Sequence, residues 1–180
     1  NHTISAEFVP LDIPLSPDET GVSDYLDTGD HNAYIFGYPG DRFGPDDPLT
    51  RAQAAQIFYR LLKDQDIPVN TVFSDVPGDA WYARAVNTLA SLGVVSGVGE
   101  GRFLPDRAIT RAEFVTMAMG FADESSSSGC SFNDVDPEAW YFKAVLCAAD
   151  YGWISGYPDG SFGPQRLGTR GEASAMVNRM

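Results

Sequence analysis

The sequence is short of cationic side chains: 12 Lys or Arg stand against 25 Asp or Glu among 180 residues, a formal net charge of −13. This balance excludes a nucleic-acid-binding protein that holds phosphates by bulk positive charge. No apolar run approaches the roughly 20 residues that cross a bilayer, so we predict no membrane insertion. The first residues also lack the basic and apolar regions of an export signal, and we expect any such signal to lie outside this sequence.

Histidine and cysteine are equally scarce. The sequence has two of each, with the histidines at positions 2 and 31 and the cysteines at 130 and 147. These are too few for a metal site or a disulfide framework, so no cofactor and no metal are predicted. A single disulfide between Cys130 and Cys147 stays open, because it requires Phe132 to fold back on the helix that follows it.

What the sequence does contain is an internal repeat. The loop Gly-Tyr-Pro-Asp-Gly-Ser-Phe-Gly-Pro at 156–164 recurs closely at 37–45 and more weakly at 97–105. Its phenylalanines, Phe43, Phe103 and Phe162, are 60 and 59 residues apart. Seven residues after each phenylalanine begins Thr-Arg-Ala-Gln, Thr-Arg-Ala-Glu or Thr-Arg-Gly-Glu. Regular spacing of this kind indicates a protein built from repeated structural units.

The repeat defines the predicted domain organisation. A head of the form Phe-x-Asp-Val followed by Trp-Tyr occurs at 73–82 and again at 132–141, whereas the first copy has none. We therefore expect a first unit with a degenerate head at 21–68, a second unit at 69–128 and a third at 129–180. Residues 1–20, rich in proline and acids, are predicted to be an extended linker from a preceding domain.

Apolar spacing predicts an all-α fold of three helix-loop-helix units, with at most six helical segments and no substantial sheet. Tyr82, Ala85, Val86 and Leu89 follow the spacing of one helical face. One helix pair cannot bury its own apolar face, so we expect the three pairs to pack together. The side chains expected in the shared core are Ile57, Phe58, Leu61, Phe114, Met117, Ala118, Met176 and Val177.

The Thr-Arg-x-Gln/Glu segments combine a helix cap with an unexplained arginine. The threonine and the Gln or Glu three residues later form a capping box. Arg51, Arg111 and Arg170 then occupy the first helical position, where the helix dipole disfavours a cation by about 0.3 to 1 kcal/mol. Two explanations stay open: a salt bridge to a carboxylate of the neighbouring unit, or the binding of an anionic ligand at the helix N-terminus.

Other function classes receive little support. The acids that recur are explained by repetition and capping, so no carboxylate pair stands out for glycoside hydrolysis, and we predict no enzyme. The Asp-Gly turns lack the Asp-x-Asp-x-Asp-Gly spacing of a calcium loop. Trp81 and Trp140 are of a type usually found in a core, but an aromatic ring beside Arg and Asp is also what a sugar-binding groove requires. A protein-binding or lattice-forming surface module stays open as the alternative.

Taken together, the Phe-x-Asp-Val, Trp-Tyr, Gly-Tyr-Pro-Asp-Gly-x-Phe and Thr-Arg-Ala-Glu segments resemble the S-layer homology domain, from about Gly29 to Met180. The resemblance implies a pseudo-threefold, all-helical module of a bacterial surface protein, monomeric and extracellular. Its implied partner is a secondary cell-wall polysaccharide, often one with pyruvate ketals, bound in grooves between units.

The resemblance also implies which residues bind. The arginines that support the acidic sugar map onto Arg51, Arg111 and Arg170. The head and loop residues that line the grooves map onto Asp75, Trp81, Asp134, Trp140, Gly97, Gly156 and Tyr157. Two departures affect individual grooves: the first unit lacks its head, and the second loop carries Glu100, which would repel an acidic polymer.

Overall fold

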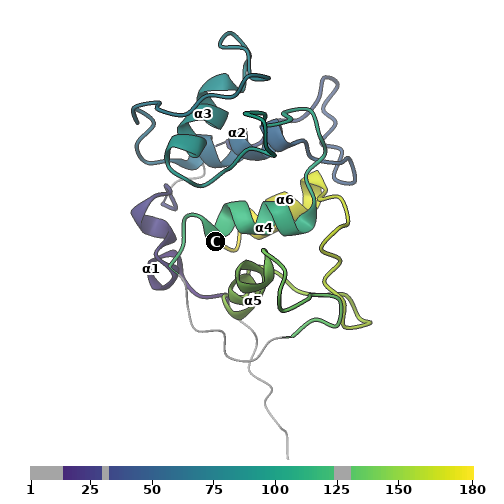
Figure 1. The fold of residues 1–180 in the computed structure, drawn as a ribbon. Coiled ribbons are helices and arrows are strands. Elements are labelled where there is room, and N and C mark those ends of the chain that lie inside the picture. Colours follow the sequence, from purple (N-terminus) through teal and green to yellow (C-terminus); the bar gives the residue numbers. More distant parts are fainter. Residues whose placement is uncertain (1–13, 30–32, 124–130) are drawn as a thin grey trace, which may run out of the picture.

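The computed structural model describes residues 14–29, 33–123 and 131–180. Within these ranges it contains α-helices, one 3-10 turn and isolated β-bridges, with no sheet. The elements are α1 (Pro17–Thr20), η1 (Val22–Asp24), α2 (Arg51–Leu61), α3 (Ala83–Ser91), α4 (Arg111–Met119), α5 (Phe142–Asp150) and α6 (Arg170–Val177). Figure 1 shows α2 with α3 at one end, α4 and α6 across the middle, and α5 beyond them. The prediction of an all-α fold is confirmed.

The second helix of every unit begins at the predicted capping box. The Thr50 side chain accepts the backbone N–H of Gln53, and the Gln53 side chain accepts the backbone N–H of Thr50. The same reciprocal pair opens α4 and α6. Just beyond α3 and α5, Gly93 and Gly152 have φ of +78° and +76°, the left-handed conformation that ends a helix at little cost for glycine.

Helices pack across unit boundaries. The helix α2 of the first unit contacts α3 of the second, and α4 of the second contacts α5 of the third. At the centre of this packing, the ring of Phe58 lies 5.4 Å from that of Phe114 and 5.3 Å from that of Phe121. Each unit therefore buries its apolar stripe against another unit, as the single-pair argument predicted.

Of the eight side chains expected in the core, seven are buried and Val177 is only partly so. Val177 is the last residue of α6. The buried seven are Ile57, Phe58, Leu61, Phe114, Met117, Ala118 and Met176.

Three backbone hydrogen bonds connect the units in a closed cycle. The N–H of Ile109 donates to Leu49 O (2.8 Å), that of Gly168 to Ile109 O (2.9 Å), and that of Leu49 to Gly168 O (2.9 Å). These residues occupy matching positions, two before each arginine, so the first unit bonds to the third as the second bonds to the first. Leu49 and Ile109 are almost completely buried.

The first unit departs from the helix-loop-helix pattern. The described part of its leading segment contains only η1, preceded by α1, which lies in the stretch expected to be an extended linker. Thr20 is buried, and the N–H of Leu15 donates to Tyr151 O at 3.0 Å, so the end of that stretch docks on the third unit. A cavity of about 650 Å³ lies between this segment and the end of α6. Residues 1–13 lie outside the described ranges.

Two further expectations concern the cysteines and the membrane. Cys147 is buried on α5, while Cys130 lies outside the described residues, so their pairing stays a prediction. Among the described residues, every helix is too short or too polar to span a bilayer.

Candidate functional site: three grooves between units

A groove lies at each junction between units. Its floor is the arginine that begins one unit's second helix, and its walls are the loop segment and second helix of the next unit. The lining of groove 1–2 includes Arg51, Ser96, Gly97, Glu113, Thr116 and Trp140. The lining of groove 2–3 includes Arg111, Ser155, Gly156, Tyr157, Glu172 and Arg179. The lining of groove 3–1 includes Arg170, Phe36, Gln53, Gln56, Arg60 and Trp81.

The grooves have similar sizes, about 210 Å³, 230 Å³ and 160 Å³ in that order. Any difference in what they bind therefore comes from their side chains.

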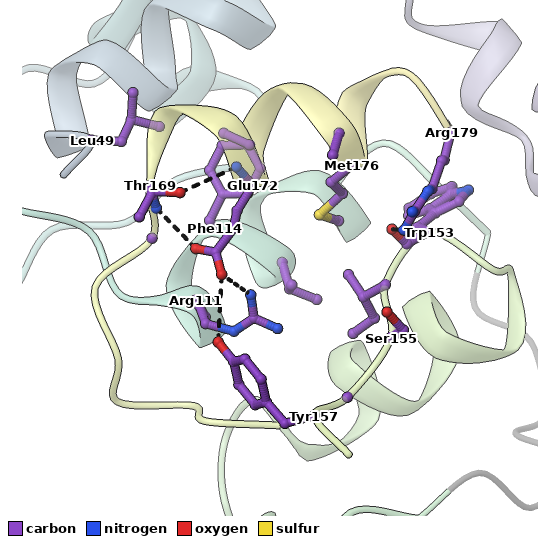
Figure 2. A pocket seen from close by; sticks show the side chains of 16 residues that line it. Leu49, Arg111, Phe114, Trp153, Ser155, Tyr157, Thr169, Glu172, Met176 and Arg179 are labelled. Carbon is purple, nitrogen blue, oxygen red and sulfur yellow. Dashed lines mark hydrogen bonds and ion pairs between the residues drawn. The ribbon is translucent and has the colours of Figure 1, made fainter. Parts of the chain in front are cut away.

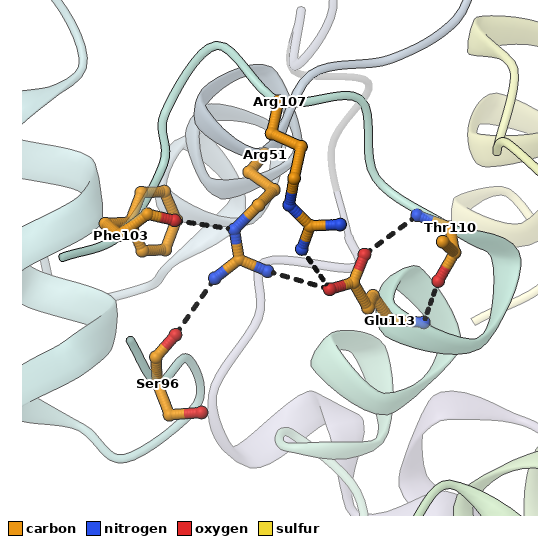
Figure 3. Close-up of polar contacts among 6 residues, drawn as sticks. All are labelled: Arg51, Ser96, Phe103, Arg107, Thr110 and Glu113. Carbon is orange, nitrogen blue, oxygen red and sulfur yellow. Dashed lines mark hydrogen bonds and ion pairs between the residues drawn. The ribbon is translucent and has the colours of Figure 1, made fainter. Parts of the chain in front are cut away.

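In groove 1–2, Arg51 is buried and fully engaged (Figure 3). Its Nε donates to Phe103 O at 2.8 Å and its Nη2 to Ser96 O at 2.9 Å. Its Nη1 lies 3.3 Å from Glu113 Oε1, and Arg107 contacts the same carboxylate oxygen. The neighbouring-unit salt bridge, one of the two explanations that the sequence left open, is thus present here.

Burial and charge act in opposition on this cluster. Burial lowers the pKa of Arg51, and Glu113 offsets part of that effect. Burial alone would raise the pKa of Glu113, but hydrogen bonds from Arg107 and the Thr110 amide outweigh it and lower that pKa. Glu113 is therefore an ionised counterion inside the groove at neutral pH.

Groove 2–3 repeats the arrangement (Figure 2). The Nε of Arg111 donates to Phe162 O at 3.0 Å. Its Nη1 lies 2.6 Å from Glu172 Oε1. The Tyr157 hydroxyl reaches the same oxygen at 3.4 Å, so the tyrosine of the predicted turn faces the groove. Glu172 also caps α6, and one carboxylate thus serves both the helix and the arginine.

Groove 3–1 has the arginine without the carboxylate. Arg170 donates from Nε to Phe43 O at 2.9 Å and from Nη2 to Phe36 O at 2.6 Å, and its guanidinium stacks on the Tyr38 ring at 4.7 Å. Within the described ranges it makes no ion pair. The matching cap residue is Gln53, which is neutral.

The head aspartates hold the loops and are not among the groove-lining residues. Asp75 accepts the backbone N–H groups of Phe103 and Leu104, both at 2.8 Å. Asp134 accepts those of Phe162 and Gly163 at 2.7 and 2.8 Å. Their carboxylates thus position the loop whose carbonyl receives the arginine.

The two head tryptophans are exposed, contrary to the usual core placement of that residue type. Trp81 is 63% exposed on groove 3–1 and Trp140 is 65% exposed on groove 1–2. Groove 2–3 has no tryptophan at the equivalent place, because the first unit lacks a head. Gly97 and Gly156 line grooves 1–2 and 2–3 and let the loop approach Phe73 and Phe132 closely.

Several groove residues escaped the sequence reasoning. Glu113 and Glu172 were assigned to capping alone, although their recurrence beside an arginine signalled the second role. Arg60 and Arg179 are at matching positions, ten residues after the capping threonines Thr50 and Thr169, where the second unit has Gly120. Comparing the three copies at that position would have found both.

Comparisons with known proteins identify a family for the repeated segments. The S-layer homology domain family matches residues 31–55, 72–115 and 131–174. Cell surface glycoprotein 1 of Acetivibrio thermocellus is 36% identical over 165 residues, which is 84% of this chain and 7% of that protein. The Cellulosome-anchoring protein of the same organism is 33% identical over 162 residues, 84% of this chain and 36% of that protein.

An enzyme is among the relatives as well. Exoglucanase XynX of Acetivibrio thermocellus is 31% identical over 150 residues, 79% of this chain and 14% of that protein. The chain thus spans between 7% and 36% of the length of these three relatives.

Proposed function

Because the chain belongs to the S-layer homology domain family, we propose that it anchors a surface protein to the bacterial cell wall by binding an acidic secondary cell-wall polysaccharide in the grooves between its units. Its family and its relatives place it outside the cell, in association with the wall. The arrangement that we propose for the units is pseudo-threefold, and the closed cycle through Leu49, Ile109 and Gly168 supports it.

The observation that carries the proposal is the pairing of an exposed indole with a buried guanidinium in one groove. Trp81 presents 63% of its surface to solvent beside Arg170, and Trp140 presents 65% beside Arg51. A sugar ring stacks on a flat apolar face, and a fixed arginine donates hydrogen bonds to a carboxylate on that ring. With a net charge of −13, long-range attraction does not assist an acidic polymer, so short-range contacts must supply the affinity.

The proposed role is non-catalytic. The relatives include both an anchoring protein and an exoglucanase, and the chain covers only 36% and 14% of them. A segment shared by an enzyme and a non-enzyme fits a module that places its neighbours at the wall.

Wall binding tests the proposal directly. The purified chain is mixed with cell walls of Acetivibrio thermocellus that retain their secondary polymer and with walls stripped to peptidoglycan. Binding to the first only, and competition by the isolated polymer, are the expected results. Equal binding to both would overturn the proposal, and binding to neither would favour the alternative, a surface module that binds protein.

Variants locate the contact. Trp81→Ala should weaken binding about tenfold, as expected for an aromatic anchor worth roughly 1.4 kcal/mol. Trp140→Ala should weaken binding less, because Glu113 already pairs with Arg51 in groove 1–2. The double variant should bind far more weakly than either single variant if one polymer engages both grooves. Val72→Ala is the control, because Val72 is 71% exposed and lines none of the grooves.

A further inference from the structure

We propose that groove 3–1 is the principal binding site for a carboxylate of the wall polymer. We also propose that Gln53 keeps the position beside the Arg170 guanidinium, the carboxylate site, unoccupied by the chain's own carboxylates. The inference rests on the proposed function and adds which groove works and why. It follows from a difference between three otherwise matching sites.

In grooves 1–2 and 2–3 a carboxylate of the chain itself occupies the matching carboxylate site beside the arginine. Glu172 Oε1 lies 2.6 Å from Arg111 Nη1, and Glu113 Oε1 lies 3.3 Å from Arg51 Nη1. A sugar carboxylate entering either groove must displace a glutamate that is held in place by its capping bond. Like-charge repulsion from that glutamate opposes entry as well.

In groove 3–1 the matching residue keeps the cap but not the charge. Gln53 Oε1 accepts the Thr50 N–H at 2.9 Å, as one oxygen of Glu172 accepts the Thr169 N–H. The other end of the Gln53 side chain is an amide nitrogen, a donor, at the position where the glutamates place an acceptor. A donor there does not neutralise the arginine.

The arginine opposite has a free donor. Arg170 is 3% exposed and fixed by its Nε and Nη2 bonds to Phe43 O and Phe36 O. Its Nη1, the atom that meets a glutamate in the other grooves, has no acceptor in the described part of the chain. An oxygen-rich anion between Arg170 Nη1 and the Gln53 amide would satisfy both donors.

The other residues that line groove 3–1 also favour an anionic ligand. Arg60 lies over the Phe36 ring at 4.2 Å and donates to Tyr34 O at 3.3 Å, and within the described ranges it has no carboxylate partner. The groove lining carries two arginines and no Asp or Glu, whereas each of the other two linings carries a glutamate. Trp81 adds the exposed ring.

The decisive variant is Gln53→Glu. It keeps the capping box, since glutamate already caps α4 and α6, so the melting temperature should be unchanged or slightly higher. It places a carboxylate on Arg170, so binding to polymer-bearing walls should fall at least about tenfold, the loss of one charge-assisted contact.

Two further variants distinguish occupation of the carboxylate site from general electrostatic repulsion. Gln56→Glu adds the same charge to the same groove, one helical turn beyond Gln53, and should weaken binding only about two- to threefold through repulsion. Glu172→Gln should open groove 2–3 and increase retention on the same walls. A Gln56→Glu loss equal to that of Gln53→Glu would overturn the role of Gln53.

The outcomes distinguish this inference from the proposed function. If wild type prefers polymer-bearing walls but Gln53→Glu binds as well as wild type, the choice of groove is wrong and the proposed function stands. If wild type binds stripped walls equally, the proposed function itself fails. Should Gln53→Glu unfold, Arg60→Gln decides instead: a loss of at least about threefold supports groove 3–1, and no loss overturns it.

Discussion

The first and third units have nearly the same loop and cap, yet their loops are held differently. In the third unit the Phe132 ring packs 5.5 Å from that of Phe162, and Asp134 accepts two loop amides, so Phe162 is completely buried. The first unit has no head, and its Phe43 is 38% exposed. Both loops still present a carbonyl to an arginine of the preceding unit in the cycle.

This difference shows that the head and the arginine do separate work. The head buries the loop within its own unit, whereas the arginine joins that loop to another unit. The first unit lacks the head and keeps only the contact between its loop and an arginine of another unit. That contact is sufficient to form groove 3–1.

The largest expected effect comes from removing the head carboxylate. Asp134→Ala leaves the Phe162 and Gly163 amides without their acceptor and should lower the free energy of unfolding by about 2 to 4 kcal/mol. Asp41→Asn in the headless first unit is the control and should change it by less than about 0.5 kcal/mol. Urea denaturation followed by circular dichroism measures both; similar losses would show that the head does not hold the loop.

A glycine series should give the next largest effect. A Cβ at Gly156 would lie 2.6 Å from Phe132 Cε1 and 2.7 Å from Ser161 O, so Gly156→Ala should cost about 1 to 3 kcal/mol of stability. At Gly37 the nearest atom is Arg42 O at 3.0 Å, with no head ring, and Gly37→Ala should cost clearly less. Equal shifts in the melting temperature of the two variants would contradict the comparison.

Acid should weaken the head of the second unit before it affects the first unit, which has no head. Burial opposes ionisation of Asp75, but bonds from the Phe103 and Leu104 amides outweigh it and lower its pKa. Its stabilising effect is therefore complete above the unfolded pKa of about 3.9 and is lost as the pH falls through the lower folded value. Amide exchange at decreasing pH should show loop 97–105 opening before loop 37–45. In Asp75→Asn this order should disappear.

The smallest expected effect on stability is that of the exposed tryptophans. Trp81→Ala and Trp140→Ala each remove a ring that is mostly in solvent. Each ring packs edge-on against the neighbouring tyrosine, with the two ring centroids 5.2 Å apart. We expect losses within about 0.5 kcal/mol, or about 1 to 2 °C in melting temperature. A melting temperature lowered by 10 °C or more would place these rings in the fold and weaken their assignment to the grooves.

The sequence predicts the parts of the fold that are encoded locally. The capping boxes at Thr50, Thr110 and Thr169 begin helices where expected, because the cap and the helix it opens are adjacent in the chain. The helical turn at Pro17 was missed, although Ser16 and Glu19 form a capping box that the sequence also displays.

The site is less predictable because its contacts join residues far apart in the chain. The sequence marks Arg170 as unusual, but not that its partners are Phe36 and Phe43, more than 120 residues away. The exposure of Trp81 was equally out of reach, since its spacing fits a buried face as well as a groove wall.

The cycle of bonds through Leu49, Ile109 and Gly168 constrains how such a chain changes in evolution. An open array gains or loses a copy at its end, because each copy touches only its neighbours. Here the third copy bonds to the first, so inserting a copy into the cycle or deleting one leaves a loop without its arginine. Duplication of a single unit within this cycle therefore disrupts the contacts between units and is an unfavourable route to variation. What remains is divergence within a fixed number of copies, of which the missing head and the change from glutamate to Gln53 are two examples.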